Sequence, residues 1–228
     1  MLREYIKTLI TPARVLVLGF AALILTGGLL LTLPYATRDG LGLPLLNALF
    51  TSTSAVCVTG LAVVDTQTTF TVFGQLVILV LIQTGGLGFM TFATFFAVLL
   101  GKKITLKERL LLQEALNQNS LAGIVRLTKH VVFYSVIIEA LGAVLLAVHW
   151  AKSLGVGRGF YYAIFHSVSA FNNAGFDLFG KFSSLTAFVG DWVTNLTIMG
   201  LIGIGGLGFA VLTELESQWK SVNRNSVS

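Results

Sequence analysis

The stretch Thr51-Ser-Thr-Ser-Ala-Val-Cys-Val-Thr-Gly-Leu61 follows a short apolar segment, residues 41–50, that is too brief to cross a bilayer. It returns as Phe165-His-Ser-Val-Ser-Ala-Phe-Asn-Asn-Ala-Gly-Phe176. Identical residues in the two copies are 115 positions apart: Ala48, Phe50, Ser52, Ser54, Ala55 and Gly60 match Ala163, Phe165, Ser167, Ser169, Ala170 and Gly175. A second motif also occurs twice, as Gly85-Gly-Leu-Gly-Phe89 and Gly205-Gly-Leu-Gly-Phe209, and its two copies are 120 positions apart. The sequence therefore predicts two copies of one unit, each with a short helix ending in a glycine-bearing loop.

The composition is that of a membrane protein. Of the 228 residues, 55% are hydrophobic and 11% are charged, whereas soluble domains carry about 25% charged residues. The net charge of +5 would suit a nucleic-acid-binding protein, but the basic residues lie beside hydrophobic runs. That is the pattern of membrane topology, so we expect a lipid environment and no nucleic-acid partner.

Four apolar runs are long enough to span a bilayer as helices, which takes about 20 residues; they are residues 15–33, 70–100, 131–150 and 185–212. Two shorter apolar segments, 41–61 and 159–176, lie between the first and second runs and between the third and fourth. Non-helical backbone at membrane depth survives only where protein or a water-filled cavity satisfies its polar groups. We therefore expect an all-α membrane protein built from two parallel span–re-entrant loop–span repeats.

The basic residues predict the orientation. Eleven of the 15 Lys and Arg lie before the first run, between the second and third, or after the fourth. Both termini and the middle linker are therefore expected in the cytoplasm. In the linker, Thr105 and Glu108 have capping-box spacing and predict a helix over residues 106–117. This helix either rests on the membrane face or docks a cytoplasmic partner. The predicted domains are a first repeat (1–100), the linker (101–122), a second repeat (123–216) and a tail (217–228).

The two loops suit ion selection. A permeating cation exchanges its hydration shell for oxygens, and main-chain carbonyls around a narrow axis supply them with little bulk. Glycine tolerates the backbone geometry that this requires. The alternative, an ordinary helix end with a glycine cap, is disfavoured because the loop is duplicated. The candidate filter residues, whose main-chain carbonyls would contact the ion, are Val58, Thr59, Gly60, Asn173, Ala174 and Gly175, with Cys57 and Asn172 as supporting neighbours.

Motifs along nearly the whole chain resemble the Trk/Ktr/HKT superfamily of potassium transporters, most closely the membrane subunit of bacterial Ktr systems. They include Cys57-Val-Thr-Gly-Leu-Ala-Val-Val-Asp65, Gly85-Gly-Leu-Gly-Phe-Met-Thr-Phe92, Gln113-Glu-Ala-Leu-Asn117 and Ser169-Ala-Phe-Asn-Asn-Ala-Gly175. The resemblance implies four units around one pore, each giving one filter glycine, here Gly60 and Gly175. It also implies K⁺ as the transported ion, Na⁺ as a candidate second ion, and a ring of cytoplasmic nucleotide-binding regulatory subunits at a bacterial inner membrane.

This chain has two units, so the resemblance makes it half of a potassium-channel-like fourfold pore. We expect it to need a complementary half, or a second copy of itself, and no organic cofactor. Two other functions remain open: a non-conducting half that only assembles with other subunits, and a small-solute carrier. The parallel repeat and the scarcity of charges within the spans disfavour a carrier.

Other features of the sequence have less bearing on the predicted function. The G-x-G-x-x-G match at residues 203–208 lies inside an apolar run with no preceding strand, so we expect close helix packing there and not dinucleotide binding. Glu139, within the third run, is either functional or paired at a helix interface, and we favour pairing. His166 is expected to pack behind the second loop. No set of residues supports enzyme chemistry.

Overall fold

Helices supply the regular structure of the computed structural model, which describes residues 12–88, 91, 94, 104–115 and 124–207. Within those residues there is no strand, only an isolated bridge between Thr37 and Phe70. The all-α prediction is thereby confirmed for the described part. The α-helices are α2 (Pro12–Leu31), α3 (Leu45–Val56), α4 (Thr66–Thr69), α5 (Val72–Gly86), α7 (Leu106–Ala115), α8 (Ile124–Leu154), α9 (Val156–Phe171) and α10 (Trp192–Gly206), and the 3-10 helices are η1 (Pro34–Ala36) and η2 (Thr186–Phe188).

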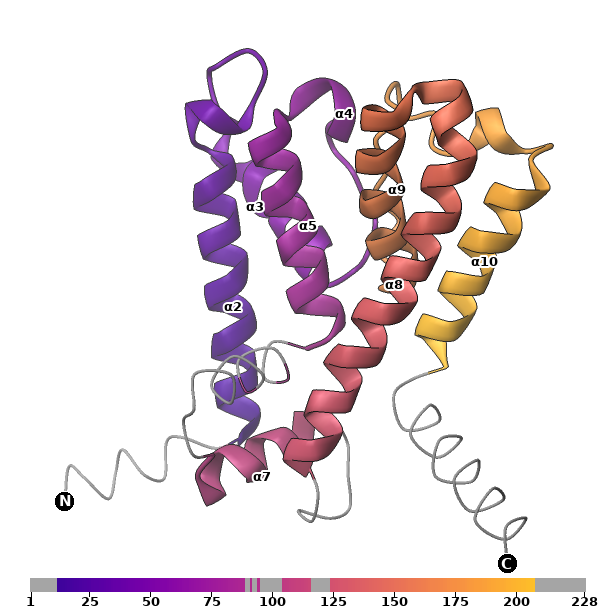
Figure 1. Ribbon diagram of the computed structural model, residues 1–228. Coiled ribbons are helices and arrows are strands. Elements are labelled where there is room, and N and C mark those ends of the chain that lie inside the picture. The colour runs from indigo at the N-terminus through magenta and orange to yellow at the C-terminus, as the bar shows by residue number, and fades with distance from the viewer. Residues whose placement is uncertain (1–11, 89–90, 92–93, 95–103, 116–123, 208–228) are drawn as a thin grey trace, which may run out of the picture.

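By their contacts, six of these helices form two groups of three, which can be followed in Figure 1. α2, α3 and α5 pack together in the first group, and α8, α9 and α10 in the second. The last residues of α3 and α9 are 115 positions apart, and α5 and α10 each have 15 residues with both ends 120 positions apart. These are the offsets of the two repeated motifs, so corresponding sequences form corresponding helices.

The first helix of each group is long and apolar enough to cross a membrane, over Arg14–Leu31 and Thr128–Leu154. α2 ends at Leu31, shortly before Pro34, which begins the 3-10 helix η1. α8 is longer than the predicted span of 131–150 at both ends, because the helix continues through polar residues such as Thr128 and Lys152. The first and third predicted spans therefore correspond to real helices with shifted ends.

The third helix of each group is shorter than the predicted span. α5 and α10 are among the shorter apolar helices. α5 stops at Gly86, and Gly88 has a φ of 77° that a regular helix does not accommodate. Helix α10 begins at Trp192 because Asp191 caps its first turn. Most of the predicted second span beyond residue 88, and the end of the fourth beyond 207, lie outside the described residues.

A serine on the short helix fixes the long helix in both groups. Ser52 Oγ of α3 donates a hydrogen bond to the Ile24 carbonyl of α2 at 2.8 Å. Ser167 Oγ of α9 donates to the Glu139 carbonyl of α8 at 2.6 Å. Both donors and both acceptors are 115 positions apart. The repeat therefore extends to side-chain contacts between the helices.

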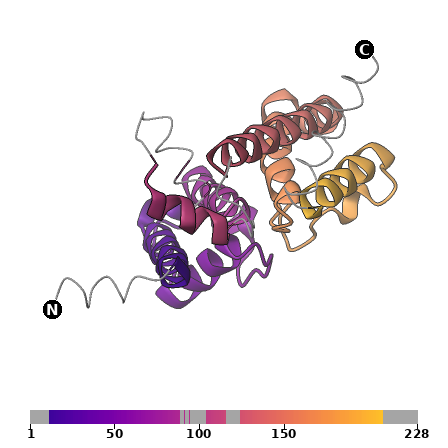
Figure 2. The ribbon, with the colours of Figure 1, turned by 90° about the horizontal axis from the view of Figure 1, so that it is seen from below.

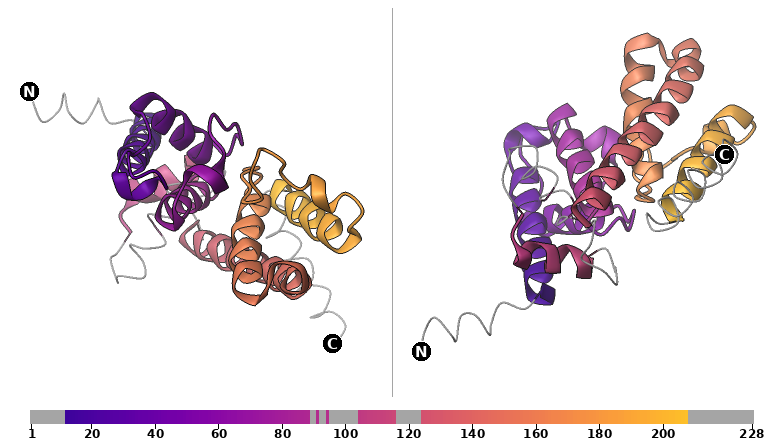
Figure 3. Two further views of the ribbon diagram at one scale, coloured as in Figure 1. Left: turned by 90° about the horizontal axis from the view of Figure 1, so that it is seen from above. Right: turned by 60° about the horizontal axis from the view of Figure 1, so that its bottom comes forward.

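The two groups lie side by side and contact each other mainly through α5 and α9 (Figure 3). Tyr161 Oη of α9 donates to Gln75 Oε1 of α5 at 2.8 Å. Near one end, Asp65 Oδ2 accepts a hydrogen bond from the Phe182 N–H at 2.8 Å. Polar contacts thus join the first group to the second at more than one level.

α7 lies across the other end of the first group and reaches the start of α8 (Figures 1 and 2). It contacts α2 and α8. The predicted capping box is confirmed, because Glu108 Oε2 accepts from the Thr105 N–H at 2.7 Å and Thr105 Oγ1 accepts from the Glu108 N–H at 3.3 Å. The predicted end at residue 117 lies outside the described residues. Apolar residues that join α7 to the long helices are Leu111, Leu112, Val15, Leu16 and Val125.

Candidate functional site

The loops after α3 and α9 leave their helices with the same hydrogen bonds. The Thr59 N–H donates to the Ser54 carbonyl, and the Ala174 N–H donates to the Ser169 carbonyl, both at 2.8 Å. The donors are 115 positions apart, and so are the acceptors. Both loops therefore turn away from the axis of the preceding helix in the same way. In each, the donating N–H lies five residues after the accepting serine.

The backbone angles of the two loops also agree. Val58 and Asn173 have φ values of 48° and 59°, and Gly60 and Gly175 have φ values of 76° and 75°. Glycine adopts this left-handed region without strain, and asparagine tolerates it, but a β-branched valine rarely enters it. The shared angles mean that the backbone course is common to both loops although the side chains differ.

The structure brings the two predicted filter glycines together. A Cβ placed on Gly60 would lie 2.5 Å from the Ala174 carbonyl oxygen and 3.4 Å from Gly175 Cα. A Cβ placed on Gly175 would lie 3.6 Å from Gly60 Cα. The loops therefore meet backbone to backbone, and Gly60 is the tighter of the two positions.

A further glycine in each group supports the loop from behind. A Cβ on Gly85 of α5 would overlap the Val56 carbonyl oxygen at the end of α3, and a Cβ on Gly205 of α10 would overlap that of Phe171 at the end of α9. Close helix packing, predicted for the glycines of residues 203–208, is thereby confirmed at Gly205. Gly203 has no atom within 4 Å of such a Cβ.

The two predicted supporting residues differ. Cys57 is a free, exposed thiol. Asn172 is buried, and its Nδ2 donates to the Val168 carbonyl at 2.9 Å and to Gln83 Oε1 and Glu139 Oε1 at 3.1 Å each. It therefore ties the base of the second loop to α5 of the first group and to α8 of its own.

The pairing favoured for Glu139 is confirmed, since this buried carboxyl accepts from Asn172 at the meeting of α5, α8 and α9. Gln83 was not singled out from the sequence. The available signal was a second amide, besides Gln75, in the apolar run of α5, because a polar side chain in such a run usually has a partner.

A cavity of about 260 Å³ borders the second loop. Its lining includes the polar residues Ser169, Asn173 and Asp177 and, from α10, the apolar residues Ile198 and Ile202. The second loop thus contacts the first loop at Gly175 and borders this cavity through Asn173, Gly175 and Phe176.

Two acidic residues follow the loops. Burial favours a raised pKa for Asp65, but hydrogen bonds from the N–H groups of Phe182 and Thr68 outweigh it and hold the pKa below its ordinary value. Burial raises the pKa of Asp177, and the negative charge of Asp65 raises it as well. A hydrogen bond from the Phe179 N–H opposes this rise without cancelling it. Asp65 is thus held as a carboxylate, and Asp177 carries its charge less readily.

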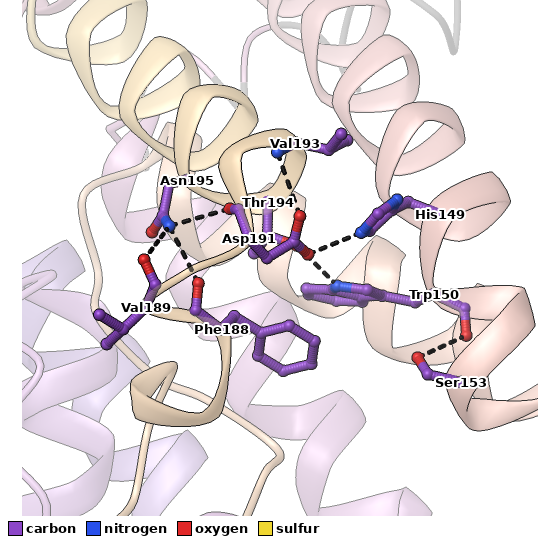
Figure 4. Close-up of polar contacts among 9 residues, drawn as sticks. All are labelled: His149, Trp150, Ser153, Phe188, Val189, Asp191, Val193, Thr194 and Asn195. Carbon is purple, nitrogen blue, oxygen red and sulfur yellow. Dashed lines mark hydrogen bonds and ion pairs between the residues drawn. The ribbon is translucent and has the colours of Figure 1, made fainter.

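The start of α10 is anchored to α8 by the cluster in Figure 4. Asp191 Oδ2 accepts hydrogen bonds from His149 Nε2 and Thr194 Oγ1, each at 2.6 Å. Trp150 Nε1 donates to Thr194 Oγ1 at 2.9 Å. The Asn195 amide donates to three carbonyls of the preceding turn. The wall behind the second loop is therefore fixed by polar contacts as well as by packing.

Comparison with known proteins identifies the family. The family model described as TrkH, cation transport protein, matches residues 12–225. The chain is 49% identical to Ktr system potassium uptake protein B of Bacillus subtilis (strain 168) over 205 residues, 90% of this chain and 45% of the relative. It is 41% identical to the protein of that name from Vibrio alginolyticus, over 91% of this chain and 45% of the relative. It is 40% identical to potassium/sodium uptake protein NtpJ of Enterococcus hirae, over 95% and 48%.

The chain thus spans a little under half the length of these relatives. The match with the family model extends over nearly the whole chain and includes both loops and all six helices of the two groups. This chain belongs to the TrkH family of cation transport proteins.

Proposed function

We propose that this chain supplies two selectivity loops of a potassium uptake pore in a bacterial inner membrane. The observation that carries the proposal is the meeting of two loops with one backbone course at Gly60 and Gly175. The relatives named above are potassium or potassium/sodium uptake proteins, which supports K⁺ as the ion and keeps Na⁺ as a second candidate.

The proposed ion contacts are the main-chain carbonyls of the filter residues, chiefly Val58, Thr59, Asn173 and Ala174. The C-terminal, partially negative ends of α3 and α9 lead into the loops and favour a cation there. Since the carbonyls bind the ion, the side chains at these positions are free to differ.

The proposed pore is a ring of four units, and the repeats at 1–100 and 123–216 are two of them. A cage that replaces a hydration shell needs oxygens from all sides, and two adjacent loops cover about half of a circle. The remaining units come from the rest of a longer polypeptide or from a second copy of this chain.

The linker, 101–122, is proposed to lie in the cytoplasm together with both termini and the tail, 217–228, and to dock a ring of nucleotide-binding regulatory subunits. α7 lies across the ends of α2 and α8, and Arg109, Leu106 and Leu110 on it are exposed. Reversing the charge of Arg109 should weaken copurification with such a ring, while reversing that of exposed Lys152 should not. Equal binding by both variants would contradict this docking site.

Ion uptake tests the filter. With all four units present in a transport-deficient strain, Gly60→Ser and Gly175→Ser should each reduce the preference for Rb⁺ over Na⁺, because a side chain disturbs the left-handed backbone. Gly190→Ser is the matched control, since Gly190 has an ordinary φ and no atom within 4 Å of a Cβ. Unchanged selectivity in both filter variants would contradict the carbonyl filter.

Reconstitution tests completeness. The 228-residue chain alone should carry no K⁺ flux in liposomes, because half a ring leaves loop backbone unsatisfied, at several kcal/mol per group (about 2–7) in an apolar medium. Addition of the complementary half should restore flux. Robust K⁺-selective flux from a demonstrably monomeric chain would overturn the half-ring proposal.

A further inference from the structure

The outer part of the second loop is bound to its own short helix at two points. Ser169 Oγ donates to the carbonyl of Phe176, the residue after the filter glycine, at 2.7 Å. The Leu178 N–H donates to His166 Nε2 at 3.3 Å. Phe176 and Leu178 are both buried, with exposed fractions of 4% and 0%. One side chain therefore fixes a carbonyl of the loop and another fixes an amide.

The His166 ring is held in one orientation. Its Nδ1 lies 2.7 Å from the Tyr162 carbonyl oxygen, which only accepts, so Nδ1 carries the proton and Nε2 is the acceptor for Leu178. Trp150 and Phe179 pack against the ring at centroid distances of 5.3 and 4.8 Å. The expectation that His166 packs behind the second loop is confirmed, and its two nitrogens join the helix to the loop.

The first repeat contains the same positions without these bonds. The counterparts of His166 and Ser169 are Thr51 and Ser54, and both are buried. Among the residues that the structure describes, neither hydroxyl has a hydrogen-bond partner. The counterparts of Phe176 and Leu178 are Leu61 and Val63, which are 59% and 44% exposed. The outer part of the first loop is therefore not held against α3.

We infer that Ser169 and His166 are positioning residues that hold the second loop in register beyond Gly175, and that Ser54 and Thr51 do not perform this role in the first loop. This inference rests on the proposed function, since the loop must select ions for its register to matter. It assigns to one of two similar loops a larger share of the pore's discrimination between K⁺ and Na⁺.

The repeat provides a matched experiment, in which Ser169→Ala and Ser54→Ala remove the same oxygen from equivalent positions. In the protein with all pore units present, Ser169→Ala should raise the KM for K⁺ relative to that for Na⁺ about five- to tenfold, as expected for loss of one buried hydrogen bond. Ser54→Ala should leave the KM ratio unchanged. His166→Leu should act like Ser169→Ala, and His166→Gln, which keeps an acceptor, should restore part of the ratio. Thr51→Val is the control for His166→Leu.

A second readout is independent of transport. In the purified protein, the amide hydrogen of Leu178 should exchange faster in His166→Leu than in Thr51→Val. If the unaltered protein takes up no K⁺, the proposed function fails, while hydrogen exchange still tests whether His166 holds the Leu178 amide. If uptake is normal but Ser169→Ala and Ser54→Ala have equal KM ratios, the positioning role is overturned. Should His166→Leu fail to reach the membrane, the two serine variants, each lacking one atom, decide the outcome.

Discussion

Alanine at the two filter glycines should have unequal effects. Both positions have φ near 75°, and a left-handed backbone costs an L-residue about 1–2 kcal/mol. At Gly175 this strain is the whole expected cost, because a Cβ would meet Gly60 Cα at 3.6 Å, an ordinary contact. We therefore expect Gly175→Ala to destabilise the protein by about 1–2 kcal/mol.

At Gly60 a second cost is added. Its Cβ would lie 2.5 Å from the Ala174 carbonyl oxygen, and relieving such an overlap typically costs about 1–3 kcal/mol. The sum for Gly60→Ala is about 2–5 kcal/mol. Because the displaced atom is a proposed ion contact, Gly60→Ala should also lose more of the stabilisation by K⁺ that binding to the folded state provides.

The assay is thermal unfolding of the purified protein with all pore units present, in detergent, with K⁺ and with a large organic cation in its place. Gly190→Ala, at an open position with an ordinary φ, is the control and should unfold like the unaltered protein. The reasoning is refuted if Gly175→Ala lowers the unfolding temperature as much as Gly60→Ala or more, or if the K⁺-dependent shift is the same in all three variants.

Four further predictions use the same unfolding assay. Val58→Asn should raise the unfolding temperature, because asparagine tolerates the φ of 48° better than a β-branched residue; an unchanged or lower temperature would contradict strain there. Gly205→Ala should destabilise by overlap with a carbonyl, whereas Gly203→Ala, with open space, should stabilise through helix propensity; equal effects would contradict the packing. Asp65 has a lowered pKa, so its contribution to stability is present at neutral pH and is lost as the pH falls through that pKa. Asp65→Asn should therefore lower the unfolding temperature at pH 7 and make that temperature depend less on pH in acid. Asp177 has a raised pKa, so its contribution to stability is present at low pH and is lost as the pH rises through that pKa. Asp177→Asn should therefore raise the unfolding temperature at pH 7 and leave it unchanged in acid. Changes of opposite sign would refute the directions given for the two pKa shifts.

The sequence predicted the parts of the structure that depend on local pattern. Identity at fixed offsets located two equivalent loops, and the hydrogen bonds from Thr59 to Ser54 and from Ala174 to Ser169 follow the same offset. The capping box at Thr105 is equally local, since both partners lie within one helical turn. A pattern of this kind specifies backbone course because the interacting groups are a few residues apart.

The contacts that distinguish the repeats were beyond the sequence. Ser54 and Ser169 are the same residue at equivalent positions, yet one hydroxyl is bonded to a loop carbonyl and the other has no partner among the described residues. The difference depends on where the chain runs after the glycine, with Phe176 buried and Leu61 exposed. That course is determined by tertiary packing, which residue identity alone does not specify. The hydrogen bond from Asn172 to Gln83, between residues 89 positions apart, was unpredictable for the same reason.

The division of work between backbone and side chain explains why the loops agree in shape and differ in sequence. At Gly60 and Gly175 the φ values agree within 1°, while the three preceding positions share no residue. If carbonyls bind the ion, these side chains need only be compatible with the backbone and are available for packing. In the second loop, the Asn172 side chain donates hydrogen bonds to Gln83 of the first group and to Glu139 of its own group. The base of this loop is therefore bound to both groups of helices. In the first loop the same position is the exposed Cys57. If the four proposed units repeat the contact of Asn172 with α5 around a ring, the exposed surface at Cys57 would face the third helix of the unit that closes the pore.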